Sequence, residues 1–275
     1  MSIVSQAIVS ESIFLADGRR FTPTQHARGP WDPRALHGGA PAALITAAFE
    51  RVEPGSELPI GRLGFELLRP IPFAPLELST QIVRAGRRVQ ELTAELHSGD
   101  ELICRASALR VQAVPAGLPE NPPSGPADLA ARAEMPPPEE GKPVRFALDD
   151  LDGDSFAASA MEMRWISDPW QLGPGRVWMR LRHPLVTGQE LTPLARLAAT
   201  ADFGNGVSAA LAFDRFLFIN ADLTIHLQRQ PRGEWIGLDA RTLLHDGASG
   251  LAESVLHDVH GVVGRAFQTL VIQPR

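Results

Sequence analysis

The chain has 275 residues, of which 44% are hydrophobic and 21% charged, a composition typical of one large or two smaller globular domains. The formal net charge of −6 argues against nucleic acid as a partner, because nucleic-acid-binding proteins carry a basic surface. No apolar run reaches the roughly 20 residues of a membrane-spanning helix, and residues 1–12 lack the features of a signal peptide. A single cysteine, Cys104, excludes an internal disulfide, so we expect a cytoplasmic protein without a membrane partner.

The first helix is predicted over residues 39–52, GAPAALITAAFERV. It consists of small residues and good helix formers, and a Pro-Gly pair follows it closely. Ala40, Ala43 and Ala47 fall on one face of this helix. A face without large side chains suits a helix that a sheet encloses, so we expect the helix to lie in the protein interior.

His37, Gly38 and Gly39 stand where this helix begins, and the glycines permit two interpretations. They can serve a tight turn or close packing of the backbone. Alternatively, their N–H groups stay open to a ligand, because the first N–H groups of a helix lack partners within it and the helix dipole attracts negative charge. His37 can either contact a substrate and move a proton or fix the loop through its ring nitrogens.

Strand-like segments follow up to about residue 113, where the composition changes. Residues 115–143 contain nine of the chain's 24 prolines, a density at which neither a helix nor a central strand persists. We therefore predict an N-terminal domain at residues 1–114, a proline-rich linker at 115–143 and a C-terminal domain at 144–275.

The C-terminal portion repeats the order of a helix followed by strands. A helix is predicted over residues 192–203, with Thr192 as its N-cap, Pro193 in its first turn and glycines from Gly204 onward closing it. Residues 217–227, LFINADLTIHL, alternate as one strand. One face of this strand would carry Leu217, Ile219, Ala221, Leu223, Ile225 and Leu227. Turns are predicted at residues 245–250 and 258–263.

The two portions also match each other in sequence. Residues 63–113 share nine identities with residues 223–273 over 51 ungapped positions, a spacing of 160. A helix followed by a curved antiparallel sheet, present twice, predicts the α+β double hotdog fold, two tandem repeats that each wrap a sheet around a central helix. Two unrelated α+β domains are the alternative.

Stretches in both portions of the chain carry a resemblance to a known family. GPWDPRALHGGAPAALITAAFER, residues 29–51, looks like the helix start of hotdog thioesterases. ATADFGNG, FINADLTIHLQRQPRGEW and GVVGRAFQTLVI resemble the C-terminal half of double-hotdog acyl-CoA thioesterases of the thioesterase II type. The resemblance implies hydrolysis of acyl-CoA, the expected partner, to a fatty acid and coenzyme A, without a metal or redox cofactor.

The resemblance also assigns roles. In that family a carboxylate on the second helix, a hydroxyl or amide residue on the next strand and a glutamine on the last strand hold the attacking water. By position these fall on Asp202, Asn220 and Gln268. The N–H groups of Gly38 and Gly39, together with His37, would then polarise the thioester carbonyl.

The residues themselves support this assignment to different degrees. Asp202 lies at helical spacing from apolar residues, where a carboxylate needs hydrogen-bond partners. Gln268 shares a strand face with Ala266 and Leu270, an unusual place for an unpaired amide. Asn220 falls on the polar face of its strand, so a bulge or a strand start is needed to turn it inward. The family often has a hydroxyl residue there, and Asn220 departs from that pattern.

Two other functions stay open at this stage. Asp32 and His37 resemble the acid and histidine pair of hotdog enoyl-CoA hydratases, although Pro33 breaks the surrounding motif. A non-catalytic acyl-CoA-binding protein would need the pocket but not Asp202 and Gln268 close together. The scattered histidines predict no metal site, and exposed sheet edges favour a homodimer or a higher homo-oligomer.

Overall fold

The computed structural model describes residues 12–53, 56–113, 134–145, 155–169 and 171–275. Its strands form one 14-stranded sheet in the order β1-β2-β4-β5-β6-β3-β11-β14-β13-β12-β9-β8-β7, with β10 paired to β14 beside this path. The strands are β1 (Phe14–Asp17), β2 (Arg20–Pro23), β3 (Ile60–Leu67), β4 (Leu76–Ala85), β5 (Val89–Ser98), β6 (Glu101–Val111), β7 (Lys142–Pro143), β8 (Met161–Trp165), β9 (Gly175–Leu181), β10 (Phe216–Asn220), β11 (Asp222–Leu227), β12 (Ile236–Leu243), β13 (Gly250–Asp258) and β14 (Gly261–Pro274).

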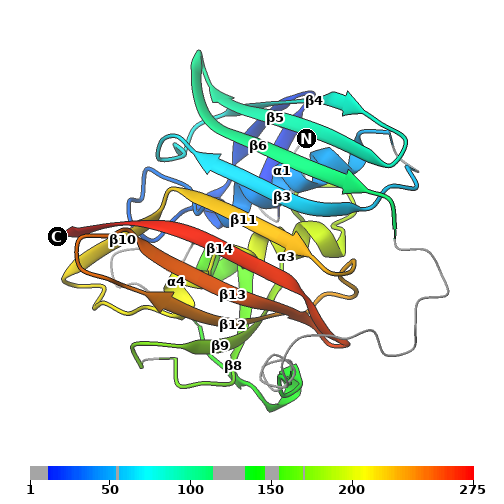
Figure 1. Cartoon of the computed structure of the whole chain (residues 1–275). Helices are drawn as coiled ribbons and strands as arrows, with labels where there is room; N and C mark the ends of the chain where they lie inside the picture. The colour runs from blue at the N-terminus through cyan, green and yellow to red at the C-terminus, as the bar shows by residue number, and fades with distance from the viewer. Residues whose placement is uncertain (1–11, 54–55, 114–133, 146–154, 170) are drawn as a thin grey trace, which may run out of the picture.

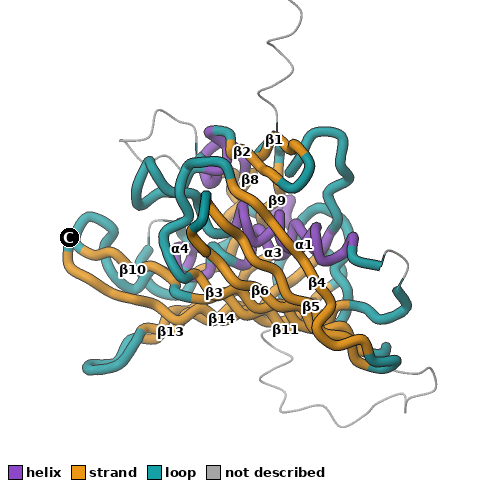
Figure 2. Tube along the Cα trace, turned by 90° about the horizontal axis from the view of Figure 1, so that it is seen from above, coloured by secondary structure: helices purple, strands orange, loops and turns teal. Residues whose placement is uncertain are grey.

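The helices lie together on one face of this curved sheet, which bends around them (Figure 1 and Figure 2). They are α1 (Gly39–Arg51), α3 (Pro193–Ala201) and α4 (Gly204–Val207), with 3-10 turns at Gln25–Ala27 and Pro138–Glu140 and a π turn at Phe156–Ala160. None of the helices in the described ranges is long and apolar enough to cross a membrane. The predicted α+β arrangement of a sheet wrapped around helices is what the structure has.

Helix α1 confirms the first helix prediction, because it begins at Gly39 and ends one residue earlier than predicted. Ala40 and Ala43 are fully buried, and Ala47 is nearly so, as the small-residue face required. The buried Arg110 of β6 closes the other end of the helix by donating to the carbonyl oxygens of Phe49 and Val52 at 2.9 and 2.7 Å. A cation at this end also offsets the negative end of the helix dipole.

Helix α3 begins as predicted but ends differently. Thr192 accepts a hydrogen bond from the N–H of Ala195 at 3.1 Å and so caps the helix, and Pro193 occupies the first turn. The prediction that Gly204 closes the helix is wrong. After Ala201 the backbone stays in the right-handed helical region, with φ of −70° at Asp202 and −81° at Phe203, and Gly204 starts α4.

The single strand predicted over residues 217–227 is also wrong, because it is two strands separated by Ala221. The N–H of Ala221 donates to the carbonyl of Thr269, while its own carbonyl accepts from the N–H of Leu67. The alternation of inward and outward side chains therefore changes phase at this residue. Phe218 is buried and Ile219 is 42% exposed, the reverse of the predicted faces, whereas Leu223 and Ile225 of β11 are buried as predicted. The turns predicted at 245–250 and 258–263 do separate β12 from β13 and β13 from β14.

The predicted linker lies only partly within the described residues, since 115–133 fall outside them. The remaining part packs on the C-terminal strands. Trp178 of β9 donates its indole N–H to the carbonyl of Pro136 at 2.7 Å, and β7 pairs with β8. These residues are thus held against the strands that follow them in the chain.

Candidate active site

Asp202 lies at the C-terminal end of α3, where the two long helices approach each other. Its side chain is only 5% exposed, so its carboxylate depends on protein partners. The Oδ1 atom accepts a hydrogen bond from Nδ2 of Asn220 at 2.9 Å, and Nε2 of Gln268 lies at 3.5 Å from it. The Oδ2 atom lies 3.0 Å from Nδ1 of His37. Residues far apart in the sequence therefore meet at one buried carboxylate.

Gln268 projects from β14 and holds the end of α3 in place. Its Nε2 donates to the main-chain carbonyl of Asp202 at 3.0 Å, and its Oε1 accepts from the N–H of Asn205 at 3.0 Å. A Cβ atom on Gly204 would stand 2.7 Å from Oε1, so only glycine leaves room for this amide. Asn205 in turn donates Nδ2 to the carbonyl of Phe218. Asn205 was not identified from the sequence, although this residue stands only three positions after Asp202.

Asn220 reaches Asp202 because β10 ends at this residue. Its Nδ2 also lies 3.2 Å from the carbonyl of Asp222, the first residue of β11. The break at Ala221 supplies the irregularity that the sequence required to turn this side chain inward. We refer to Asp202, Asn205, Asn220, Gln268 and His37 as the Asp202 cluster.

The His37 ring is buried between the carboxylate of Asp202 and two aromatic rings. Its ring stacks on Phe203 with centroids 4.2 Å apart and tilts against Phe156 at 5.0 Å. Nδ1 faces both Oδ2 of Asp202 and, at 3.1 Å, the N–H of Gly39. A single nitrogen cannot serve both at once. It donates to the carboxylate when it carries the proton and accepts from Gly39 when it does not.

Gly38 and Gly39 both lie where a larger residue would collide. A Cβ atom on Gly38 would stand 2.8 Å from Oδ2 of Asp202, and a Cβ on Gly39 would collide with the carbonyl oxygen of Ala199 in α3. The close-packing interpretation therefore accounts for both glycines. The N–H of Gly38 makes no hydrogen bond to another of the described residues, whereas that of Gly39 faces His37.

Asp32 does not join this cluster. Its Oδ1 accepts from the main-chain N–H of Arg34, and the Arg34 guanidinium binds both carboxylate oxygens at 3.1 and 2.9 Å. These bonds hold the pKa of Asp32 below its usual value of 3.8, and the bond from the Arg34 side chain has the largest effect. The structure thus pairs Asp32 with an exposed arginine and pairs His37 with Asp202.

Two cavities border the Asp202 cluster. The first has a volume of about 50 Å³ and is lined mainly by apolar and aromatic side chains beside His37 and Asn205. The second has a volume of only about 10 Å³ and touches Asp202, Gly38 and Cys104. A cavity of about this size holds a single water molecule. Burial raises the pKa of the Cys104 thiol to about 12, so this neighbour is a neutral group.

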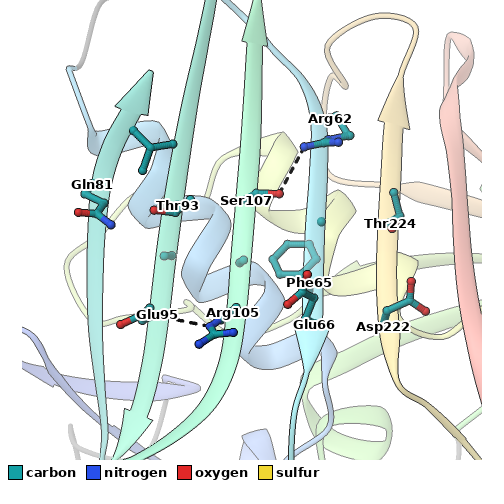
Figure 3. Close-up of a pocket in the computed structure, with 14 residues that line it drawn as sticks. Arg62, Phe65, Glu66, Gln81, Thr93, Glu95, Arg105, Ser107, Asp222 and Thr224 are labelled. Atoms are coloured by element: carbon teal, nitrogen blue, oxygen red, sulfur yellow. Dashed lines mark hydrogen bonds and ion pairs between the residues drawn. The ribbon is translucent and has the colours of Figure 1, made fainter. Parts of the chain in front are cut away.

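A larger groove, of about 610 Å³, lies on the other face of the sheet, away from α1 (Figure 3). The groove is lined by the small side chains of Thr93, Ser107 and Thr224. Arg62 and Glu66 also line it. It contains no member of the Asp202 cluster. Volume alone therefore does not locate the candidate active site.

No group of three or more histidine, cysteine, aspartate or glutamate side chains in the described ranges is arranged to hold a metal ion. The chemistry available at the cluster is that of a buried carboxylate with amide and imidazole partners. Such a group can take a proton from water and return it, provided that a substrate carbonyl lies within reach.

Comparison with solved structures identifies the fold of the protein. A conserved hotdog-fold protein from Alicyclobacillus acidocaldarius is 17% identical, with a TM-score of 0.69 over 99% of both chains. The TesB protein of Mycobacterium avium subspecies paratuberculosis is 13% identical, with a TM-score of 0.61 over 95% of this chain and 96% of that one. An acyl-CoA thioesterase II from Mycobacterium marinum is 14% identical, with a TM-score of 0.58 over 91% and 96%. The protein therefore has a hotdog fold.

Comparison with models of protein families identifies the family of the chain. Residues 27–111 match the acyl-CoA thioesterase N-terminal domain, and residues 126–272 match the acyl-CoA thioesterase C-terminal domain. The chain belongs to the acyl-CoA thioesterase family, as the resemblance in its sequence indicated. No curated protein gives a significant match.

Proposed function

We propose that the Asp202 cluster hydrolyses acyl-CoA thioesters by activating water. One observation carries the proposal: a carboxylate that is 5% exposed, held by the amide of Asn220 and facing His37, lies beside an apolar cavity. A buried carboxylate with fixed partners is suited to general-base catalysis, because its orientation is set before the substrate arrives.

In the proposed reaction, Asp202 takes a proton from water while the water oxygen adds to the thioester carbonyl. The cavity of about 10 Å³ that Asp202 and Gly38 help to line is the place for this water. The tetrahedral intermediate then expels the coenzyme A sulfur, and the proton held by Asp202 passes to that sulfur. The products are a carboxylic acid and the free thiol of coenzyme A.

The start of α1 would stabilise the negative charge that develops on the carbonyl oxygen. The N–H of Gly38 and the positive end of the α1 dipole lie beside Asp202. Gly39 can contribute its N–H when Nδ1 of His37 carries the proton and turns to Asp202. The nitrogen of His37 that carries the proton would thus decide whether Gly39 acts as an oxyanion donor. Gln268 and Asn205 would act as positioning residues, because they fix the end of α3.

The contacts favour hydrolysis over the two other functions. A binding protein has no need for Gln268 and Asp202 in contact, yet Nε2 of Gln268 lies 3.0 Å from the Asp202 carbonyl. The hydratase alternative needs Asp32 at the site, and Asp32 is bound to Arg34.

The site would form between two tandem repeats, the double hotdog. Moving the bounds of β3 to β6 forward by 160 gives 220–227, 236–245, 249–258 and 261–271, close to those of β11 to β14. We propose domains at 1–114 and 144–275 joined by a linker at 115–143.

A homodimer or higher oligomer and a cytoplasmic location are part of the same proposal, and the free, buried Cys104 suits a reducing compartment. Light scattering would measure the oligomeric state.

Thiol release from acyl-CoAs of two to 16 carbons tests the proposed function. We expect the wild type to release thiol and Asp202→Asn to lose about 10³-fold in kcat, within the range of a general base. Glu50→Gln is the matched control, because Glu50 is a carboxylate of α1 whose Oε2 accepts from Thr192, outside the cluster. Full activity in Asp202→Asn, or none in the wild type, would contradict the proposal.

A further inference from the structure

The apolar cavity beside His37 has one polar feature that the proposed mechanism does not use. Trp165, the last residue of β8, lines this cavity and is 6% exposed. Its indole Nε1 is buried and has no hydrogen-bond partner among the described residues. A buried indole N–H normally finds an acceptor, because leaving it unpaired costs its full desolvation. The donor is therefore open to an acceptor that the described residues do not supply.

None of the other residues that line the cavity accepts a hydrogen bond from this donor. Met163, Met179, Val207 and Phe203 contribute apolar surface. Asn205 donates its Nδ2 to Phe218 and its N–H to Gln268, and its Oδ1 accepts no hydrogen bond from Nε1 of Trp165. The cavity is thus apolar except for the catalytic end at His37 and the indole N–H of Trp165.

The volume of the cavity limits what can enter it. About 50 Å³ is far below the roughly 300–1,000 Å³ of pockets that hold drug-sized ligands. Met163 and Met179 are 3% and 0% exposed and form part of the wall, so a long chain would have to displace packed side chains. Trp31, which also lines the cavity, stacks on Phe213 with centroids 5.5 Å apart. This space favours a short or flat acyl group over a long chain.

We propose that the preferred acyl group is short and carries an acceptor oxygen, a hydroxyl or a carbonyl, that binds Nε1–H of Trp165. This specificity rests on the proposed function, since it places the thioester at Asp202. The acceptor oxygen supplies the missing partner of the indole, and the body of the acyl group lies against the methionine and aromatic walls.

Two substrate pairs test the acceptor directly: hexanoyl-CoA against 5-oxohexanoyl-CoA, and phenylacetyl-CoA against 4-hydroxyphenylacetyl-CoA. Each pair is measured as hydrolysable thioesters, for kcat/KM, and as the matching thioethers, for Kd by calorimetry. In the wild type we expect the oxygenated member of at least one pair to be favoured about tenfold in both readouts. Dodecanoyl-CoA should be at least tenfold worse than hexanoyl-CoA.

Trp165→Phe removes the indole N–H and keeps an aromatic ring, so we expect the preference to disappear. Trp178→Phe is the matched control, because its N–H is bound to Pro136 outside the cavity. It should keep the preference and lower the melting temperature, whereas Trp165→Phe loses no hydrogen bond to another of the described residues.

Equal affinity within both wild-type pairs, or a preference that survives in Trp165→Phe, would overturn the inference. The wild-type pairs decide the question even where the variant does not fold. The two proposals fail separately. Hydrolysis without a preference removes only the Trp165 inference, and a thioether preference without hydrolysis removes only the proposed function.

Discussion

The two halves of the sheet use matched positions for different purposes. In the C-terminal half, Asn220 binds the buried carboxylate of Asp202 and Gln268 binds the main-chain carbonyl of the same residue. The positions 160 residues earlier hold Ile60 and Ala108, both buried and apolar. The N-terminal half instead supplies the start of α1 with His37 and Gly38. In the proposed double repeat, one scaffold present twice therefore gives a single proposed site, because each half supplies parts that the other lacks.

The same contrast holds for polar residues away from the site. His257 is 1% exposed and its two ring nitrogens have no partner in the described part of the chain, while its counterpart His97 lies near Glu95 at the surface. Arg229 binds the fully buried carboxylate of Asp258, whereas its counterpart Arg69 pairs with the exposed Glu101. At these two pairs of positions the C-terminal half therefore buries polar groups whose counterparts in the N-terminal half lie at the surface.

The largest effect is expected from Gln268→Met. Loss of its amide frees the Asp202 carbonyl and the N–H of Asn205, so we expect kcat to fall about 10²- to 10³-fold. Gln90 is the matched control, since it is also buried and bridges Arg110 and Glu53 within the N-terminal half. Gln90→Met should lower the melting temperature and leave kcat within threefold of wild type. Equal losses of kcat in both variants would show that Gln268 acts only through stability.

The second prediction concerns the pH dependence of stability. Burial, aided by the nearby Arg176, lowers the pKa of His257 from 6.5 to about 4. The unfolded chain therefore binds a proton between these pH values that the folded chain does not, and stability falls as the pH falls. Over this interval His257 should account for about 3 kcal/mol of lost unfolding free energy. Urea unfolding from pH 7 to 4.5 should show a shallower decline for His257→Asn, and an unchanged one for His97→Asn.

The third prediction compares the two arginines. In Arg229→Met, Asp258 keeps the N–H groups of Arg232 and His260 but loses its guanidinium partner. We expect a loss of about 2 kcal/mol in unfolding free energy, less than for a fully buried pair because Arg229 is 33% exposed. Arg69→Met should change it by no more than about 0.5 kcal/mol. Similar values from chemical denaturation of the two variants would remove the contrast.

The smallest effect is expected from Gly38→Ala. The added Cβ would stand 2.8 Å from Oδ2 of Asp202 and push the carboxylate aside, so kcat should fall about tenfold, or about 1.4 kcal/mol in the barrier. Gly64→Ala is the control on the outer face of β3, where the nearest atom is Oγ of Ser107 at 3.3 Å. Steady-state kinetics that leave Gly38→Ala at wild-type activity would contradict this geometry.

Much of the fold could be predicted because local signals agreed with the tertiary structure. Thr192 and Pro193 mark the start of α3, and the alanines of α1 mark a helix that must be buried. The convergence of Asp202, Asn220 and Gln268 was also expected, although from the family resemblance and not from spacing. The structure brings them together through α3, β10 and β14.

The remaining features depend on contacts that no local pattern contains. The phase change at Ala221 arises because its N–H and carbonyl bind strands on both sides, Thr269 and Leu67. Gly204 signals a helix end in sequence, but Gln268 holds Asn205 in a further helical turn. Gly39 is required by Ala199 of α3, 160 residues away. Each of these is a long-range contact, and the sequence alone gives only the residue that makes it.

The number of sites per chain tests the central claim most directly. Calorimetric titration of the wild type with S-hexyl-CoA, a thioether that cannot be hydrolysed, counts binding sites against chain concentration. A single composite site, built from the start of α1 and the end of α3, predicts one molecule bound per chain. Two molecules bound per chain would contradict the account, because each half would then hold a site of its own.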